Sequence, residues 1–400
     1  MTKSKVLWIV SLAAVLATPT TSMAAWWSSS TVTLGGVTQF TGFLADAGRY
    51  YRDGYKFAVD RINEKGGVTV GGKAYKLALK LVDNKSDPRA TLGLYERLVT
   101  KDKVEGLLSP YSSTEVLTAA SVAEKHQVPM IQAGGAAGRI VARGYKYVFG
   151  TLPAAEDDFR STIWMLEQLT PKAKTVGVVS SDDSDTTPAA GILALLKKAG
   201  MEIVLHQQYS ERIPNFFNIL TLLKGRTPDW LFFSGREVNA IKYIREAKDR
   251  NIHPNLLASF VGVSAGGFRT RFGKDANYAF GLTPWMPREQ LKDRWFGDAS
   301  QFAAGYEKKF GYAPDYHAAA AVAAVEAHVA AIEAAGTLDP KQVRDAIAKL
   351  DFESLYGRIH FDENGQITIP QTVMQVQGDK LIEVFTDKLV NPPVLSLIHI

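Results

Sequence analysis

Two successive runs of alternating strand-like and helix-like segments constrain the fold of this chain more than any other feature. The first run predicts strands at 32–40, 75–83 and 104–108, and helices at 50–64, 88–100 and up to His126. The second run predicts strands at 175–180, 202–209, 229–234 and 256–261, and helices at 188–200, 216–224 and 238–250. Such alternation builds parallel sheets with right-handed crossovers. The sequence therefore predicts an α/β protein with two doubly wound lobes that divide around Gly150.

The last third of the chain departs from this alternation. Helices are predicted at 316–335 and 343–350, whereas 358–384 reads as short antiparallel strands with a hairpin turn at Asn364-Gly365. Two lobes joined by several short crossings would suit this order of elements. In such an arrangement the cleft between the lobes is the expected binding site.

The N-terminus has the features of a secretory signal. Lys3 and Lys5 precede an apolar stretch at 6–17, which is too short to span a bilayer, and Ser22-Met-Ala24 provides small residues for cleavage. An uncleaved anchor is the alternative. The chain has no cysteine, which excludes disulfides and lipid attachment through a thioether, and we expect a soluble, exported, periplasmic protein.

Charge and motif content argue against several classes of function. The chain has 46 Lys and Arg against 41 Asp and Glu, a net charge of +5 without any block of like charge, which is too weak for a nucleic-acid partner. The seven histidines show no metal-ligand spacing, and they are interpreted as surface or satisfied interior residues. No set of nucleophile, base and orienting residue is recognisable, so we expect no catalytic residues, no metal, no cofactor and no enzymatic activity.

The stretch from Gly106 to Val116 carries the strongest candidate site. An apolar strand ends at Ser109-Pro110, and a helix begins at once. In one interpretation, Ser112 and Ser113 and the first helical turn bind an anion such as a ligand carboxylate. In the other, Ser112 only caps the helix, since Glu115 stands three residues on, as in a capping box. The carboxylate of Glu115 must face away if an anion binds here.

A glycine-rich loop follows the next strand. Gly134, Gly135 and Gly138 match neither a Walker A loop nor a dinucleotide fingerprint. The loop is interpreted as a close approach of the backbone to a small ligand, or as a plain tight turn.

Several motifs together resemble the type I periplasmic substrate-binding proteins of ABC transporters, in the leucine/isoleucine/valine-binding family. The resemblance is specific over the first 150 residues and looser to about residue 388. The motifs are Gly42 with Gly48, Gly54 to Asn63 with Gly66-Gly67, Asp83 to Pro88, Ser109 to Ser113, Val128 to Ile131, and Tyr147 to Phe149.

The resemblance implies a two-lobed clamp with a three-crossing hinge, which delivers a solute to an inner-membrane ABC permease. It divides the chain into a signal peptide (1–24), lobe 1 (31–150 plus 284–357), lobe 2 (151–283 plus 358–388) and a tail (389–400). Residues 394–400 resemble translated adapter DNA and are interpreted as an artefact, with an apolar terminal strand as the alternative. The resemblance to the family also implies that Ser112 binds the ligand carboxylate, with help from the backbone of Gly134 to Ala136. We expect a monomer.

Two departures from the family bear on the ligand. Members that bind amino acids commonly have Thr where Ala136 stands and, for the ammonium group, Glu where Phe260 aligns. One hypothesis is therefore an aromatic or aliphatic carboxylate without an amine, with walls from Phe43, Tyr111 and Phe260 and with Arg236 on a second polar group. The other is a branched-chain amino acid whose ammonium is bound by Glu237. An amide receptor or a sensor partner with the same clamp remains a further alternative.

Overall fold

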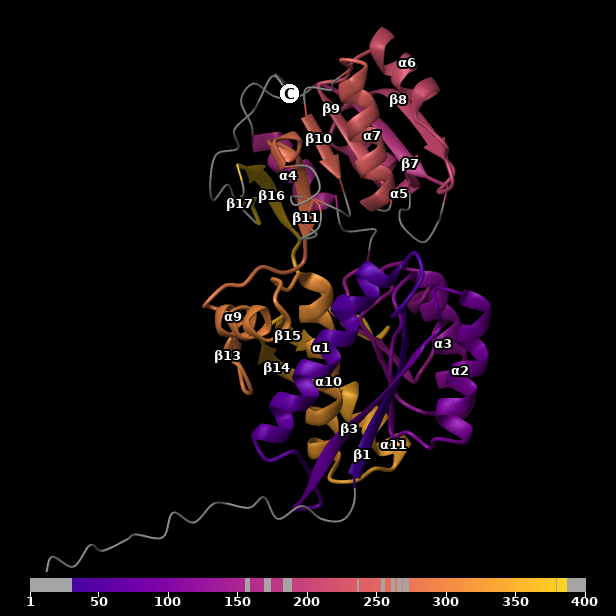
Figure 1. Ribbon diagram of the computed structural model, residues 1–400, viewed down its shortest axis with the longest axis vertical. Coiled ribbons are helices and arrows are strands. Elements are labelled where there is room, and N and C mark those ends of the chain that lie inside the picture. Colours follow the sequence, from indigo (N-terminus) through magenta and orange to yellow (C-terminus); the bar gives the residue numbers. More distant parts are fainter. Residues whose placement is uncertain are drawn as a thin grey trace, which may run out of the picture.

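The computed structural model describes two large sheets, each built mainly of parallel strands and covered by helices on both faces, and two small two-stranded sheets (Figure 1). The described residues are 31–154, 159–168, 174–182, 189–235, 237–252, 256–259, 263, 264, 268, 273–378 and 380–386. The α/β fold with two doubly wound lobes that the alternation predicts is therefore confirmed.

The first sheet has the strand order β2-β3-β1-β4-β5-β6, and only the pairing of β2 with β3 is antiparallel. Its core on one face contains α1 and α10, and its core on the other face contains α2 and α3. The strands are β1 (Thr31–Thr38), β2 (Val68–Val70), β3 (Lys73–Asp83), β4 (Gly106–Leu108), β5 (Met130–Gln132) and β6 (Val148–Gly150). The helices are α1 (Ala45–Glu64), α2 (Pro88–Thr100), α3 (Ser113–His126), α9 (Ala299–Phe310), α10 (Tyr316–Ala335) and α11 (Pro340–Ile347).

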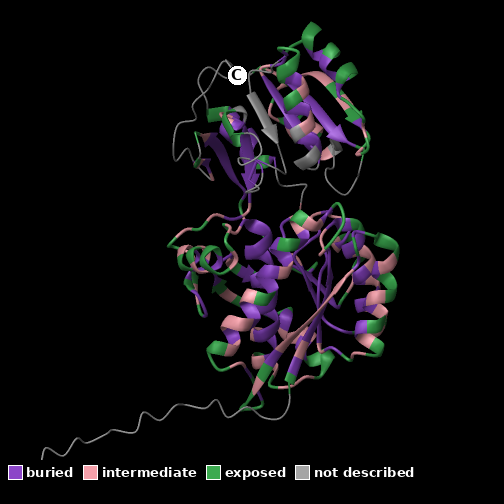
Figure 2. Cartoon of the chain, in the orientation of Figure 1, coloured by how far each residue is buried: buried purple, intermediate pink, exposed green. Residues whose placement is uncertain are grey.

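Helix α10 is the central helix of the first lobe. Nearly all of its residues are buried, as its colour in Figure 2 shows. Within the described part of the chain it is also the one helix long and apolar enough to cross a membrane, but burial in the core accounts for that composition. Helix α1 approaches it closely at Gly54, because a Cβ atom there would lie 2.7 Å from the carbonyl oxygen of Ala318. The pair of helices thus depends on small residues at their contact.

The second sheet has the strand order β17-β16-β11-β10-β9-β7-β8. The first five strands in the chain are parallel, and β16 and β17 add an antiparallel edge beside β11. The strands are β7 (Thr175–Ser181), β8 (Glu202–Tyr209), β9 (Trp230–Ser234), β10 (Leu256–Ser259), β11 (Phe280–Thr283), β16 (Thr372–Gln377) and β17 (Lys380–Phe385). The helices are α4 (Arg160–Gln168), α5 (Ala189–Lys198), α6 (Phe217–Gly225) and α7 (Glu237–Asp249).

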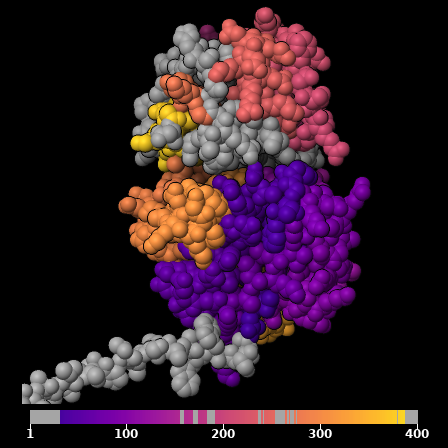
Figure 3. Space-filling model, in the orientation of Figure 1, coloured from indigo at the N-terminus to yellow at the C-terminus, as the bar shows by residue number. Residues whose placement is uncertain are grey.

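The chain passes between the lobes three times. It leaves the first lobe after β6, returns to it after β11, and enters the second sheet again at β16. In the space-filling view the orange residues that follow β11 pack against the indigo start of the chain, which shows this return (Figure 3). The first and third passages lie side by side, because Gly150 donates to Gly365 (2.8 Å) and accepts from Ile367 (3.1 Å) through backbone atoms.

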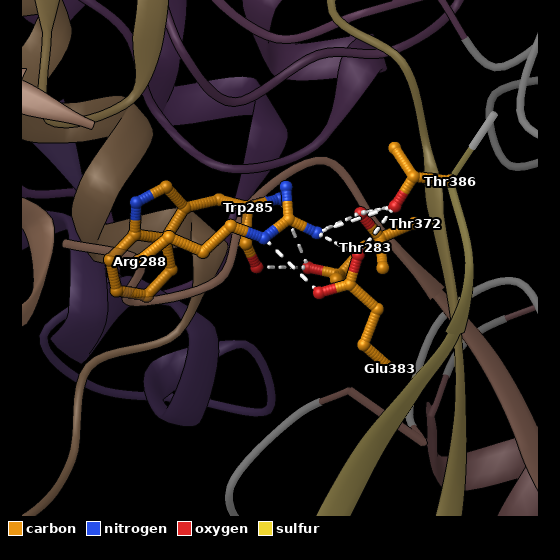
Figure 4. Close-up of polar contacts among 6 residues, drawn as sticks. All are labelled: Thr283, Trp285, Arg288, Thr372, Glu383 and Thr386. Atoms are coloured by element: carbon orange, nitrogen blue, oxygen red, sulfur yellow. Dashed lines mark hydrogen bonds and ion pairs between the residues drawn. The ribbon is translucent and has the colours of Figure 1, made fainter. Parts of the chain in front are cut away.

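Polar contacts tie the second passage to β16 and to the end of β17 in the second sheet (Figure 4). Trp285 is buried in the core of the first lobe, and its indole N–H donates to the carbonyl of Leu355 (2.8 Å). Three residues on, the guanidinium of Arg288 reaches back to the second lobe, where it pairs with Glu383 (2.7 Å) and donates to Thr372 (2.9 Å). The second passage is therefore anchored in both lobes.

The prediction of a hairpin at Asn364-Gly365 is wrong. Gly365 closes a tight turn to Asp362, but no pair of described strands is joined by it. Strand β15 (Gly357–His360) pairs with β14 (Asp351–Ser354), whereas β16 pairs with β11 and β17. Each strand that flanks the turn pairs instead with its other neighbour in the chain, a choice that a turn signal does not reveal. Residues between β15 and β16, including Phe361 and Ile367, are buried in the core of the first lobe, so the third passage follows them.

The remaining short strands, β12 (Lys292–Asp293) and β13 (Gly297–Asp298), precede α9. They and α9 have no counterpart in the elements that the sequence predicts.

Candidate ligand-binding site

The loops that follow β1, β4 and β5 lie together at the carboxyl edge of the first sheet. Strand β6 is parallel to them and ends at the first passage, so this edge faces the second lobe. Two tyrosines of α1 fix the loops, since Tyr51 donates to the carbonyl of Ala133 (2.8 Å) and Tyr55 to that of Ser109 (3.0 Å). Burial raises the pKa of both phenols well above the usual value, so both remain neutral donors.

Ser112 has an unusual backbone conformation at the start of α3. Its φ is 85° and its ψ is 144°, a region that residues other than glycine rarely occupy. Its N–H donates to the carbonyl of Gly134 (3.3 Å), and its carbonyl accepts from Val116 (2.9 Å). The loop after β5 and the first turn of α3 therefore hold Ser112 in place from both sides.

The capping box that the spacing predicts is absent. The side chain of Ser112 accepts no hydrogen bond from the N–H groups of α3. Glu115 does not reach back to Ser112 either, because its carboxylate accepts from Gln39 (2.7 Å) and Asn84 (2.6 Å) at the ends of β1 and β3. The competing partners come from distant parts of the chain, which is why the local spacing was misleading.

The buried contacts of Glu115 also remove one objection to an anion at this loop. Its side chain is inaccessible to solvent and is held by amide donors under the loop. Gln39 donates in addition to the carbonyl of Tyr111 (2.9 Å). The positive end of the α3 dipole is therefore beside Ser112 and Ser113 while the acidic side chain of the first turn is bound elsewhere.

The glycine-rich loop packs against the loop after β4. A Cβ atom at Gly134 would overlap the carbonyl oxygen of Pro110, so no larger residue fits without a backbone shift. The N–H of Gly135 donates to the side chain of Gln132 (2.8 Å), and Ser113 Oγ accepts from the N–H of Ala137 (3.2 Å). Close packing of the two loops explains why glycine stands at these positions. Ala136, in the same loop, is half-buried and packs against the core of the first lobe.

An aromatic group lies next to Ser112. The ring of Tyr111 stacks on Tyr51, with centroids 5.9 Å apart, and meets the edge of His317 at 5.5 Å. His317 is in the first turn of α10, and its Nδ1 lies 3.1 Å from the carboxylate of Asp315. Sequence reasoning missed this histidine. The Asp315-x-His317 spacing at a predicted helix start was the available signal, but contact with Tyr111 was not foreseeable.

The other residues that the sequence singles out are only partly placed by the structure. Phe43, in the loop after β1, is 76% exposed, so it forms no wall in the described conformation. Glu237 is the first residue of α7, at the carboxyl edge of the second sheet, but its side chain lies outside the described part of the structure. Arg236 and Phe260 lie outside the described residues.

Two buried serines contribute further polar groups at the carboxyl edge of the second sheet. Ser180 on β7 pairs in register with Ser234 on β9, and neither hydroxyl has a hydrogen-bond partner among the described residues. Strand β11 of the same sheet ends at the second passage, so this edge faces the first lobe. Sequence reasoning did not single out either serine.

Comparisons with known proteins agree with this architecture. A family model described as periplasmic binding protein matches residues 31–380. A protein named Leu/Ile/Val-binding protein homolog 7 from Brucella suis biovar 1 (strain 1330) is 26% identical over 383 residues, which cover 90% of this chain and 92% of that protein.

Solved structures show the same fold. The substrate-binding protein LivJ from Streptococcus pneumoniae, in complex with isoleucine, has a TM-score of 0.78 at 23% identity and covers 89% of this chain and 100% of its own. A solute-binding protein from R. palustris in complex with 4-hydroxybenzoate has a TM-score of 0.78 at 19% identity, and the match covers 90% of this chain and 98% of that protein. Another from R. palustris, in complex with benzoate, has a TM-score of 0.77 at 17% identity and covers 93% and 100%. The relatives that it resembles carry the name Leu/Ile/Val-binding protein homolog, and on the match of the family model over most of its length the chain belongs to the periplasmic binding protein family.

Proposed function

We propose that this protein captures a small carboxylate between its lobes and delivers it to the membrane permease of an ABC importer. The conformation of Ser112 carries the proposal. A strained backbone at the mouth of a helix, with a hydroxyl that the helix does not use as a cap, is typical of a residue arranged for a ligand. The carboxylate would accept hydrogen bonds from Ser112 and from the first turn of α3.

The electrostatics of the loop support an anion. The dipole of α3 favours negative charge at its N-terminus, and the carboxylate of Glu115 is engaged by amide donors below the loop. Ser180 and Ser234 at the facing edge of the second sheet would supply further hydroxyl donors when the lobes close.

The body of the ligand is apolar in this proposal. Tyr111 is only partly buried and stacks on the fully buried Tyr51, so its ring offers an aromatic wall beside Ser112 that suits a branched aliphatic chain or an aromatic ring. Phe43, Arg236, Glu237 and Phe260 are proposed to complete the site from its rim and from the second lobe. Relatives of the same fold whose structures contain isoleucine, benzoate or 4-hydroxybenzoate agree with a ligand of this size and charge.

Export to the periplasm is part of the proposal. The family is periplasmic, and the segment 1–24 would direct the chain there and be removed after Ala24. The N-terminal residue of the protein recovered from the periplasm, determined by mass spectrometry, should then be Ala25. An intact N-terminus on the recovered protein would contradict cleavage.

Isothermal titration with leucine, 4-methylpentanoate, benzoate and 4-hydroxybenzoate tests the function. We expect at least one of these carboxylates to bind, to raise the melting temperature, and to be recovered chemically unchanged. Leucine binding at least tenfold tighter than 4-methylpentanoate and benzoate would identify an amino-acid site and direct attention to Glu237. Conversion of a bound ligand to a product would contradict the proposal.

A further inference from the structure

His317 is a buried histidine that is only half satisfied by its surroundings. Its side chain is 5% exposed, and its Nδ1 lies 3.1 Å from Asp315. Its Nε2 has no hydrogen-bond partner among the described residues. Most buried polar atoms in folded proteins are paired, so this nitrogen requires an explanation.

Asp315 determines which nitrogen of the ring presents a lone pair. The carboxylate accepts from the backbone N–H of His317 (3.0 Å), as the N-cap of α10, and its second oxygen faces Nδ1. Because a carboxylate only accepts, the proton of a neutral imidazole belongs on Nδ1. In that neutral form Nε2 is a hydrogen-bond acceptor.

The position of the ring connects it to the proposed ligand. The first turn of α10 lies at the carboxyl edge of the first sheet, where Thr151 donates to the carbonyl of Ala320 (3.3 Å). The ring of His317 meets the ring of Tyr111, the residue that immediately precedes Ser112, at 5.5 Å and an interplanar angle of 82°. The ring centroid of Tyr51 lies 5.5 Å from that of His317. The imidazole therefore belongs to a largely buried aromatic cluster with Tyr51 and Tyr111 beside the carboxylate loop.

We infer that Nε2 of His317 recognises a hydrogen-bond donor, a hydroxyl or an ammonium group, on the carboxylate that binds in the cleft. The inference rests on the proposed function and specifies the ligand further. It makes His317 a specificity-determining residue: a ligand with a donor satisfies the buried acceptor, whereas a ligand without one leaves it unpaired. The missing polar partners at Ala136 and Phe260 are then compensated from α10.

Two matched pairs of ligands separate the donor from the rest of the molecule. Leucine against 4-methylpentanoate tests an ammonium donor, and 4-hydroxybenzoate against benzoate tests a ring hydroxyl. Isothermal titration of the unaltered protein should show a preference of about tenfold or more for the donor-bearing member of one pair. In His317→Phe, which keeps an aromatic ring, the preference should disappear, with the donor-free ligand binding as before.

Two further variants keep the test decisive if His317→Phe does not fold. His317→Gln retains an acceptor on a side chain of similar reach and should keep part of the preference. His328→Leu alters another buried histidine of α10, whose Nε2 contacts the carbonyl of Leu107 (3.0 Å) in the core, and should leave the preference unchanged.

The outcomes distinguish this inference from the proposed function. Carboxylate binding with no preference in either pair, or equal weakening of both members of a pair in His317→Phe, would overturn the role of His317 alone. Failure of the unaltered protein to bind any of the four carboxylates would overturn the proposed function, and the inference with it.

Discussion

Replacing Ser112 by alanine removes the hydroxyl of the proposed carboxylate site and leaves the rest of the loop unchanged. The backbone bonds that hold Ser112, to Gly134 and Val116, do not involve its side chain. Since the hydroxyl does not cap α3, its loss should have little effect on folding. The variant therefore separates binding from stability.

The structure sets the expected magnitudes. A hydrogen bond from a hydroxyl to a charged carboxylate contributes about 1.5 to 3 kcal/mol, which corresponds to a loss of affinity of roughly 10- to 150-fold. The free energy of unfolding should change by less than about 0.5 kcal/mol, because the hydroxyl of the buried Ser112 makes no capping hydrogen bond that its removal would break. Loss of a true N-cap would instead cost about 0.5 to 2 kcal/mol.

A second variant, Ser112→Gly, tests the strain at φ 85°. Relief of the strain would raise the free energy of unfolding by about 1 to 3 kcal/mol, and the greater freedom of glycine in the unfolded chain would lower it by about 0.5 to 1 kcal/mol. Ser112→Gly should therefore be more stable than Ser112→Ala while showing the same loss of affinity. Denaturant unfolding and isothermal titration, with whichever carboxylate binds the unaltered protein, give the two quantities.

One pair of results would refute this reasoning. If Ser112→Ala unfolds about 1 to 2 kcal/mol more easily but binds the carboxylate as before, the hydroxyl is a helix cap and the anion site lies elsewhere.

Three other properties can be measured on the same protein. Gly134→Ala should cost about 1 to 3 kcal/mol in denaturant unfolding, because the new Cβ meets the carbonyl of Pro110, whereas Gly93→Ala, in open space on α2, should be neutral or stabilising; equal stabilities would contradict this. Burial lowers the pKa of His328 from 6.5 to about 4. The unfolded chain then binds the proton first as the pH falls, so His328 should reduce stability by about 3 kcal/mol between pH 6.5 and 4, at 1.36 kcal/mol per pKa unit. His328→Leu should flatten that part of the profile, and an unaltered slope would count against a neutral His328. Saturating ligand should reduce the radius of gyration in small-angle scattering as the lobes close about the three passages, and an unchanged radius would argue against closure.

Elements with strong local signals could be predicted from the sequence almost to the residue. Helix α2 begins and ends as its pattern indicates, because Asp87 caps it by accepting from Arg89. The bounds of α10 agree equally well, with Asp315 as the cap. In both cases the decisive contact lies within a few residues of the helix end.

Features that depend on distant contacts could not be predicted. The carboxylate of Glu115 binds Gln39, which is 76 residues away in the chain, and the capping box therefore never forms. The interest of His317 depends on the contact of its ring with Tyr111, which lies in the loop after β4. The spacing of residues does not reveal the conformation of Ser112, since a serine in a sequence gives no indication of a positive φ. The helix N-terminus that follows β4 could therefore be located from the sequence, but the geometry of its loop could not.

The pairing of β11 with β16 has a consequence for how the molecule is made. Strand β11 completes its ladder only with residues near the end of the chain, and the first lobe obtains its central helix α10 only after most of the second lobe has been synthesised. The chain must thus be synthesised as far as the segment 361–377 before either core can close. The nascent chain stays without a finished domain for most of its synthesis, and an unfinished domain is the form that can still be threaded through a membrane pore.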